Sequence, residues 1–377
     1  MKRGLLALSV WLLASAQVPP PAPAWNAAAL AQLRHWVDAA PEDALPRPDT
    51  AALDRVAAGG NAAAIDQAAD TLALRLARMH LLGTGARTGW KIADGDTAID
   101  LPAVLRQALA AGTLEPFLAG LRPQHPDYTA LRAAYAVERD PARRADLARN
   151  MERWRWMPHR LADDYVLVNA ASFEARLWRG GRQAGVWPVI VGKTRTPTPV
   201  FAATITGVTL NPWWDVPGSI VRESVGALMR RSPATARARG YVWSGGRIRQ
   251  RPGPGNSLGQ MKLVMPNPYG VYLHDTPNRD LFGREVRAFS HGCVRVGDAL
   301  GLAAAVLDGV RTRAQIDALV AAGDTVSIDA ARSMPVYITY FTAGLRGDGS
   351  FAHFPDIYRR DAKVLALAPG EGEACAI

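Results

Sequence analysis

The chain has 377 residues, of which 49% are hydrophobic, so it is long enough for two domains and can bury a substantial core. Its formal net charge is +10, from 44 basic and 34 acidic side chains. This charge favours a polyanion or carboxylate-bearing substrates as partners, although codon bias in a GC-rich genome accounts for the many arginines equally well. No nucleic-acid motif accompanies the charge, so we do not expect a nucleic-acid partner.

The N-terminus has the pattern of a secretory signal peptide over residues 1–16. Lys2 and Arg3 precede an apolar stretch over 4–14, and the small-x-small site Ala14-Ser15-Ala16 follows. The stretch is shorter than the roughly 20 residues that span a bilayer, and an uncleaved anchor is the alternative. We therefore expect an exported, periplasmic protein with no integral membrane segment after cleavage. The proline-rich residues 17–27 are typical of a linker.

Alanine- and leucine-rich sequence over 28–157 predicts an all-helical domain. One helix is expected over 100–112, with Asp100 as N-cap and Gly112 as stop signal. Another is expected over 141–157, where Trp154 and Trp156 would dock the helix on the next domain. For these tryptophans we favour core packing over sugar stacking.

The hydrophobic period changes to two at about residue 165, which predicts a mainly-β domain over 163–330. Strands are expected at 165–169, 172–178, 186–192, 201–212 and 262–276. An irregular segment at about 213–260, with a short helix at 219–231, is long enough to be a lid. Asp298 would cap a helix over 299–307, and Thr312 with Gln315 would form the capping box of a helix that ends at Gly323. Residues 331–377 would supply a final strand at 335–343 and a tail. The fold class is therefore α+β.

The stretch RAFSHGCVRV (287–296) holds Cys293, one of two cysteines in the chain. The other, Cys375, lies close to the C-terminus, and a disulfide between them is a minor alternative in an oxidising compartment. A thiol is a nucleophile only as thiolate, and a histidine within hydrogen-bond reach would lower its pKa. His274 and His291 are the two candidates. His274 ends an alternating strand and would face Cys293 if the two strands are neighbours.

Two other interpretations of this cluster remain open at this point. His274, His291 and Cys293 would be three ligands of a zinc site, although no CxxC or suitably spaced carboxylate accompanies them. Alternatively, Cys293 is a small buried residue without chemistry. Gly292 favours the catalytic interpretation, because it lets the backbone turn closely enough for amides to form an oxyanion hole.

The pattern of His274, fifteen residues, then Ser290-His291-Gly292-Cys293 resembles the signature of the L,D-transpeptidase catalytic domain, the YkuD-type fold. The similarity extends to NMERWRWMP (150–158), VIVGKTRTPTPVF (189–201), NPWWDVPGSI (211–220), PGPGNSLG (252–259) and MPNPYGVYLHDTP (265–277), which look like the large periplasmic members. The resemblance implies a β-sandwich with short helices and a lid insertion, preceded by an all-α scaffold domain.

Two features depart from that family pattern. Arg295 stands where many members have asparagine, although arginine at this position also resembles the large members. The small peptidoglycan-binding helical module that large members often carry between scaffold and catalytic domain is not apparent. Glycan anchoring would then fall to the scaffold or the lid.

The resemblance implies an acyltransferase that needs no metal or cofactor. Cys293 would attack peptidoglycan tetrapeptide stems and form a thioester, with His274 as general base and acid. An acceptor amine on a neighbouring stem would then give a 3→3 cross-link. Carbapenem β-lactams would acylate the same thiol. The alternatives are a cell-wall L,D-carboxypeptidase, a cysteine endopeptidase or a non-catalytic wall-binding scaffold protein.

The remaining site residues are assigned on the same resemblance. The amides of Cys293 and Gly292 would hold the oxyanion. Three neighbouring residues would support this oxyanion site: Ser290, His291 and Tyr272. Arg295 would bind a stem carboxylate, or else form a structural salt bridge. Trp213 and Trp214, at the start of the lid, would line the acceptor groove or simply pack.

Overall fold

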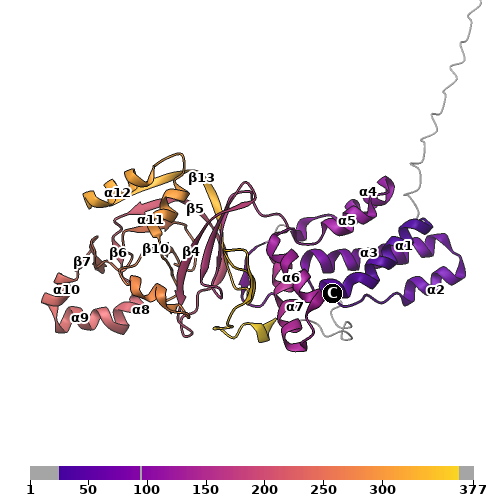
Figure 1. Ribbon diagram of the computed structural model, residues 1–377, viewed down its shortest axis with the longest axis horizontal. Coiled ribbons are helices and arrows are strands. Elements are labelled where there is room, and N and C mark those ends of the chain that lie inside the picture. Colours follow the sequence, from indigo (N-terminus) through magenta and orange to yellow (C-terminus); the bar gives the residue numbers. More distant parts are fainter. Residues whose placement is uncertain (1–24, 94–95, 365–377) are drawn as a thin grey trace, which may run out of the picture.

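The protein is elongated, with helices at one end, a β domain in the middle and a small helical subdomain at the other end (Figure 1). The computed structural model describes residues 25–93 and 96–364. The predicted signal peptide, most of the linker and Cys375 lie outside the described residues. Within the described ranges, no helix combines the length and apolar character needed to cross a membrane.

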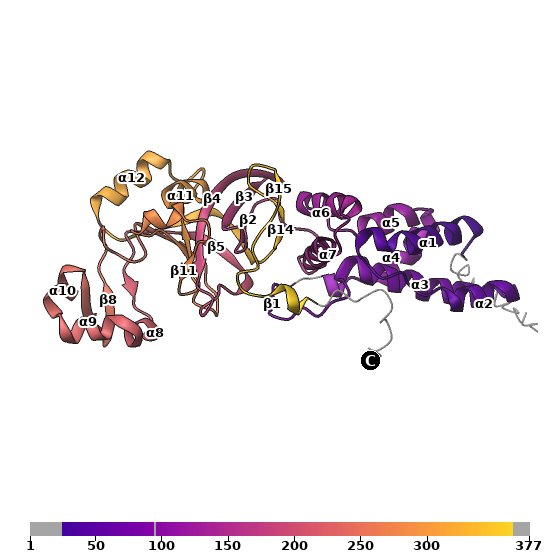
Figure 2. The same ribbon diagram turned by 60° about the horizontal axis from the view of Figure 1, so that its bottom comes forward.

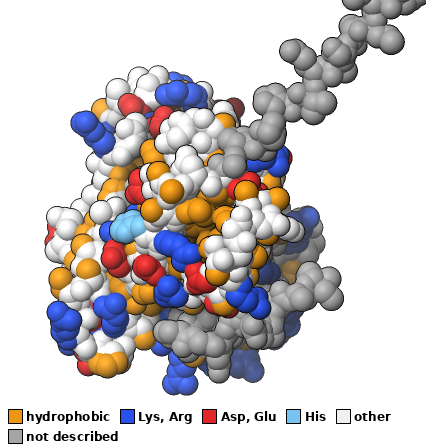
Figure 3. Space-filling view, turned by 90° about the vertical axis from the view of Figure 1, so that its right-hand side faces the viewer, with side chains coloured by type: hydrophobic (Ala, Val, Ile, Leu, Met, Phe, Trp, Pro, Cys, Tyr) orange, Lys and Arg blue, Asp and Glu red, His pale blue; other side chains and the backbone are white. Residues whose placement is uncertain are grey.

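The helical end has a hydrophobic core of its own, which includes Leu33, Trp36, Leu72 and Leu76. Its helices are α1 (Ala27–Ala39), α2 (Ala51–Gly59), α3 (Ala62–Leu82), α4 (Leu101–Ala111) and α5 (Leu114–Gly120). The stop and start signals of the sequence are confirmed for α4, where the Asp100 side chain accepts from the Ala103 amide at 3.0 Å and Gly112 has φ +66°. Side chains of both charges are interspersed with apolar ones on this end of the molecule (Figure 3).

Two further helices, α6 (Pro126–Val137) and α7 (Pro141–Arg155), lie between the helical end and the β domain, and their buried apolar residues belong to the core of the β domain (Figure 2). Trp154 of α7 is 2% exposed, and its indole is stacked between the His125 ring, at 4.2 Å, and the Phe341 ring, at 4.7 Å. Both faces of this indole are therefore covered. The packing role expected of Trp154 is confirmed, and no open face remains for a sugar.

The central sheet closes on itself. Its strands run in the order β5-β13-β2-β3-β4-β12-β10-β9, and β9 also pairs with β5. Their bounds are β2 (Tyr165–Asn169), β3 (Glu174–Arg179), β4 (Arg182–Gly192), β5 (Val200–Leu210), β9 (Met261–Val264), β10 (Leu273–His274), β12 (Val294–Val296) and β13 (Val326–Thr339). The apolar residues of alternate positions fill the interior of this closed sheet.

Shorter elements complete the β domain. β1 (Trp90–Lys91), from the helical half of the chain, pairs in parallel with β5, and β11 (Ala288–Ser290) pairs with β4. α11 (Ala299–Val306) and α12 (Arg313–Ala322) lie beside the sheet, with the predicted Asp298 cap and Thr312–Gln315 capping box both formed (Figure 1). β14 (Ala343–Leu345) and β15 (Phe351–His353) form a separate hairpin.

Two predicted strands differ from those observed. The strand expected over 262–276 is divided into β9 and β10, because Pro266, Pro268 and the positive φ of Gly270 (+62°) interrupt the ladder between them. The final strand, expected at 335–343, is β13, which starts at Val326 and crosses residue 330. The sheet of the β domain therefore includes residues that the sequence assigned to the C-terminal segment.

The lid, residues 213–260, is a folded subdomain rather than an irregular loop. It contains β6 (Trp214–Asp215), α8 (Gly218–Ile220), a π-helical turn over Val221–Val225, α9 (Gly226–Arg231), α10 (Pro233–Ala238), β7 (Tyr241–Ser244) and β8 (Arg247–Gln250). A small apolar cluster of Val216, Val225, Ala236, Tyr241 and Ile248 holds it together. This insertion lies at the end of the molecule opposite the helical domain (Figure 1).

Candidate active site

Strand pairing brings Cys293 and His274 onto one face of the sheet. β10 and β12 are parallel neighbours, with His274 opposite Arg295, and the Val294 amide donates to the Tyr272 carbonyl at 2.9 Å. Cys293 is therefore the diagonal neighbour of His274, and such residues on paired strands have Cα atoms about 7–8 Å apart. This separation lets a thiol and an imidazole approach each other.

The site lies on the face of strands β9, β10 and β12 that is opposite to their fully buried core residues. Leu263, Leu273 and Val294, on the opposite face of the same three strands, are 0% exposed and belong to the main core. These apolar positions fix which way the alternate residues point, because a slip of one residue would turn the core side chains outward. The face that carries His274 and Cys293 is therefore set by hydrophobic burial.

His274 is held as a buried, neutral base. Its Nδ1 contacts the backbone carbonyl of Asp275, and because a carbonyl only accepts, Nδ1 carries the proton and Nε2 is left as the basic nitrogen. Burial and the nearby Arg295 lower the pKa of His274 to about 4, against the opposing effect of the Asp275 and Leu258 carbonyls. The hydrogen-bond acceptor for Nδ1 is thus supplied by the backbone of Asp275, the next residue in the chain.

Asp275 fastens the end of the lid beside His274. Its carboxylate accepts from the Gln260 amide at 2.8 Å and from the Arg279 guanidinium at 2.9 Å. Gly259 has φ +62°, and a Cβ there would lie 2.3 Å from the Asp275 carboxylate. Sequence analysis did not single out Asp275. The acidic residue directly after the histidine, with the glycine of NSLG upstream, was the available signal.

Cys293 is a partly buried thiol with no disulfide partner among the described residues. Burial raises its pKa, opposed by the Tyr272 amide and by the charges of Arg295 and Lys262. Its Sγ lies 3.8 Å from the Gly270 carbonyl, and no hydrogen bond joins it to His274 in the described ranges. The pKa therefore differs from the lowered value that the sequence led us to expect, because the thiol is desolvated and has not yet engaged the imidazole.

The turn before Cys293 is fixed by Ser290. The Ser290 hydroxyl donates to the Cys293 carbonyl at 2.6 Å and accepts from the Gly292 amide at 3.1 Å. Gly292 has φ +112°, a conformation that favours glycine. The Gly292 amide is thus occupied, whereas that of Cys293 has no acceptor in the described part of the chain. Of the two amides nominated for an oxyanion hole, only that of Cys293 is free to donate.

His291 is turned toward the lid. Its Nε2 lies 2.8 Å from the Glu223 carboxylate on the π-helical turn, so it links the SHGC turn to the lid. Among residues 25–93 and 96–364, no group of three or more His, Cys, Asp or Glu side chains is arranged to hold a metal ion. The zinc alternative for His274, His291 and Cys293 therefore has no geometric support.

Two cations flank the cysteine and histidine. Arg295 forms no salt bridge with any described residue, and its Nε is buried without a hydrogen-bond partner. Lys262 lies opposite His274 on β9, with its Nζ 4.6 Å from the centre of the Tyr272 ring. The structural salt bridge considered for Arg295 is absent from the described part of the chain.

Trp213 and Trp214 contact residues of the lid itself. The Arg249 guanidinium lies 4.8 Å from the centre of the Trp213 ring, and Trp214 packs on the lid cluster near Tyr241. These contacts match the packing interpretation of the two tryptophans. A role in an acceptor groove rests on sequence alone.

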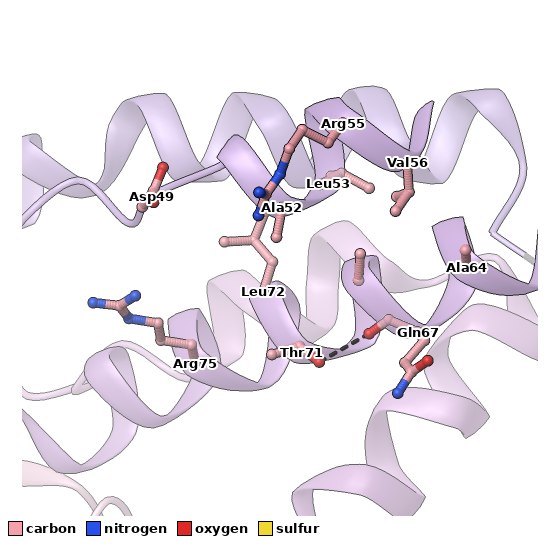
Figure 4. Close-up of a pocket in the computed structure, with 11 residues that line it drawn as sticks. Asp49, Ala52, Leu53, Arg55, Val56, Ala64, Gln67, Thr71, Leu72 and Arg75 are labelled. Atoms are coloured by element: carbon pink, nitrogen blue, oxygen red, sulfur yellow. Dashed lines mark hydrogen bonds between the residues drawn. The ribbon is translucent and has the colours of Figure 1, made fainter. Parts of the chain in front are cut away.

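A separate cavity of about 510 Å³ lies in the helical domain, between α2 and α3 (Figure 4). Leu53 and Val56 of α2 and Leu72 of α3 line it with apolar side chains, and Arg55 and Arg75 are among its charged lining residues. None of its lining residues belongs to the strands that carry Cys293 and His274. We therefore place the candidate active site at the sheet, not at this cavity.

Comparisons with known proteins agree with this location. Residues 163–328 match the family model of the L,D-transpeptidase catalytic domain, YkuD, and residues 21–134 match that of the Scaffold domain. A putative L,D-transpeptidase of Haemophilus influenzae is 31% identical over 240 residues, which cover 58% of this chain and 48% of that protein. The chain thus spans about half the length of this curated relative.

Solved structures with lower similarity include two L,D-transpeptidases. L,D-transpeptidase 3 from Mycobacterium tuberculosis is 15% identical, with 47% of this chain and 60% of that chain covered and a TM-score of 0.26. The catalytic domain of the Enterococcus faecium enzyme acylated by ertapenem is 13% identical, with 48% and 98% covered and a TM-score of 0.27. From the two family models, the chain carries a YkuD-type catalytic domain of the L,D-transpeptidase family behind a Scaffold domain.

Proposed function

We propose that the protein is a peptidoglycan L,D-transpeptidase that forms 3→3 cross-links through a thioester on Cys293. The observation that supports this most directly is the pairing of β10 with β12, which puts a neutral imidazole and a thiol side by side on one face. The match to the YkuD model covers both residues. We also propose that the protein is exported to the periplasm, where its substrate lies.

The first half of the reaction is acylation. As Cys293 Sγ attacks the carbonyl carbon of the third stem residue, its proton passes to Nε2 of His274. The Cys293 amide, which has no other acceptor, donates to the oxyanion. When the tetrahedral intermediate collapses, the C–N bond breaks, the amine of D-alanine takes the proton from His274, and a thioester remains on Cys293.

The second half transfers the acyl group. A side-chain amine of the third residue of another stem attacks the thioester carbonyl and gives its proton to His274. The C–S bond then breaks, and the sulfur is reprotonated as the 3→3 amide leaves. The thioester conserves the energy of the cleaved bond, so the reaction requires no ATP and no cofactor. With water as acceptor, the same steps release a tripeptide, which is the L,D-carboxypeptidase alternative.

The neighbouring residues position these groups. Ser290 fixes the turn by donating to the Cys293 carbonyl, and Asp275, next to His274 in the chain, accepts from the Gln260 amide at the end of the lid. His291 fixes the lid to the same turn through Glu223. The Tyr272 backbone lowers the pKa of the Cys293 thiol against the effect of burial, and the Tyr272 ring packs against Lys262. Trp213 and Trp214 are proposed to line the acceptor groove from the lid.

The test is incubation of the mature protein with purified disaccharide-tetrapeptide, with products read by mass spectrometry. We expect a dimer that has lost one D-alanine. Cys293→Ala should abolish it, and His274→Ala should reduce its rate by about 10²–10⁴-fold, the usual range for a general acid–base group. Cys375→Ala and His353→Ala are matched controls that should retain activity. Cross-linking by Cys293→Ala would refute the assignment.

The same experiment separates the alternatives. Shortened monomers without dimers would favour a carboxypeptidase, and cleavage inside cross-linked stems would favour an endopeptidase. We also expect a carbapenem to add its mass to the wild type but not to Cys293→Ala, because its strained amide accepts the same thiol. A wild type that neither turns over stems nor gains mass would instead be a non-catalytic wall-binding protein.

A further inference from the structure

Three strands place a row of basic side chains across the site. His274 on β10 is opposite Lys262 on β9 and opposite Arg295 on β12, so the imidazole lies between two cations on one face. Paired residues on neighbouring strands point to the same side of the sheet. Cys293 precedes Arg295 by two residues and shares its face. The thiol therefore lies beside the Arg295 end of a row formed by Lys262, His274 and Arg295, which we call the cationic row.

The charges of this row are not compensated by the protein. Neither Lys262 nor Arg295 takes part in a salt bridge with any described residue, and the buried Nε of Arg295 has no acceptor. The one carboxylate adjacent in sequence, Asp275, belongs to the alternate face and is engaged by Gln260 and Arg279. Partly buried cations are normally paired, so this row lacks an anionic partner.

A carboxylate next to the scissile bond has the right reach to be that partner. The strand rise of about 3.3 Å per residue puts the Cα atoms of Cys293 and Arg295 roughly 7 Å apart. A reacting carbonyl carbon lies about 3–3.5 Å from the nucleophile. In a stem that ends one residue after the scissile bond, the terminal carboxylate is three covalent bonds further on, roughly 4 Å. The carboxylate would thus lie roughly 7 Å from the sulfur, which is about the separation of the Cys293 and Arg295 Cα atoms along the strand.

We propose that Lys262 and Arg295 form a carboxylate-binding pair that selects a scissile bond one residue from a free C-terminus. This assignment rests on the proposed function, and it names the residues that would read the end of the donor stem. A donor extended by one residue, or capped as an amide, would put a neutral group against two partly buried cations. Such an unmade charge-assisted contact costs about 10- to 100-fold in binding or rate.

The direct test compares two donors, the disaccharide-tetrapeptide with a free C-terminus and the same compound as C-terminal amide. For the wild type we expect kcat/KM to be about 10- to 100-fold higher for the free acid. Lys262→Gln and Arg295→Gln should each lower this preference, with most of the loss on the free acid and in KM. Lys262→Arg and Arg295→Lys should restore part of it. Arg237→Gln, an exposed arginine of the lid, is the control that should leave the preference unchanged.

A second measurement does not depend on turnover. Alkylation of Cys293 by iodoacetate relative to iodoacetamide compares an anionic and a neutral reagent at the same thiol, so the ionisation of the sulfur cancels in the ratio. The ratio should fall in Lys262→Gln and Arg295→Gln and stay constant in Arg237→Gln. An unchanged ratio in both row variants would overturn the assignment of the cationic pair.

The outcomes distinguish this inference from the proposed function. Equal turnover of free acid and amide by the wild type would refute the inference and leave the transpeptidase assignment standing. An equal loss on both donors in the row variants would also refute it, because that pattern indicates a structural role. A wild type that turns over neither donor would refute the proposed function and, with it, the selection of a stem terminus.

Discussion

The pH at which activity falls on the acid side of the profile should lie well below the usual range for an enzyme with a histidine base. Burial and Arg295 lower the pKa of His274 to about 4, from an ordinary value of about 6.5. At about 1.4 kcal/mol per pKa unit, the site prefers the neutral ring by roughly 3 kcal/mol more than water does. At pH 5 an ordinary histidine would be only about 3% neutral, whereas His274 would be about 90% neutral and ready to accept the thiol proton.

The first assay is the pH dependence of kcat/KM, which reports the ionisation of the free enzyme. The second is an NMR titration of the His274 ring proton, whose signal is assigned by its absence from the spectrum of His274→Gln. We expect a midpoint near 4 in the wild type. Lys262 and Arg295 are the charged groups identified beside the ring, and both oppose its protonation. Arg295→Gln should therefore raise the midpoint. A wild-type midpoint at or above 6.5, or a midpoint that falls in Arg295→Gln, would refute this account of the base.

Two further predictions concern stability. Asp127 of α6 and Arg176 of β3 form a bidentate ion pair (3.1 and 2.6 Å), and both side chains are 4% exposed. Asp127→Asn should therefore lower the free energy of unfolding of the β domain, measured in urea, by about 3–5 kcal/mol, because it leaves a buried charge unpaired. A loss of less than about 1 kcal/mol would contradict the importance of this pair. His80 is buried with both ring nitrogens unpartnered, and burial lowers its pKa to about 3. The folded pKa lies below the unfolded one, so stability is present above about 6.5 and is lost as pH falls toward 3. From pH 7 to 5 this loss is about 2 kcal/mol, which His80→Leu should remove; an acid slope equal to that of the wild type would contradict it.

Local signals were sufficient for much of the secondary structure. The strand predicted at 165–169 is β2, and the caps at Asp100, Asp298 and Thr312 are formed, because capping and alternation depend on residues within one turn or one strand. Prediction failed where the decision is not local. The lid acquired its own core from residues as far apart in the chain as Val216 and Ile248, and β13 was extended by its pairing with β5.

The site shows the same division. The spacing of His274 and Ser290-His291-Gly292-Cys293 was enough to nominate nucleophile and base, because residue types and gaps can be read along the chain. The sequence did not predict three further features of the site: the lowered pKa of His274, the raised pKa of Cys293 and the contact of His291 with the lid. Burial and nearby charges, the causes of those shifts, exist only once distant segments meet.

The sequence by itself determined that a thiol and an imidazole belong to one motif in a β domain behind a helical one. Only the tertiary structure decided that Lys262 lies on one side of His274 and Arg295 on the other. Lys262, His274 and Arg295 come from three strands separated by loops, and their meeting depends on a register that the buried apolar residues of the opposite face select.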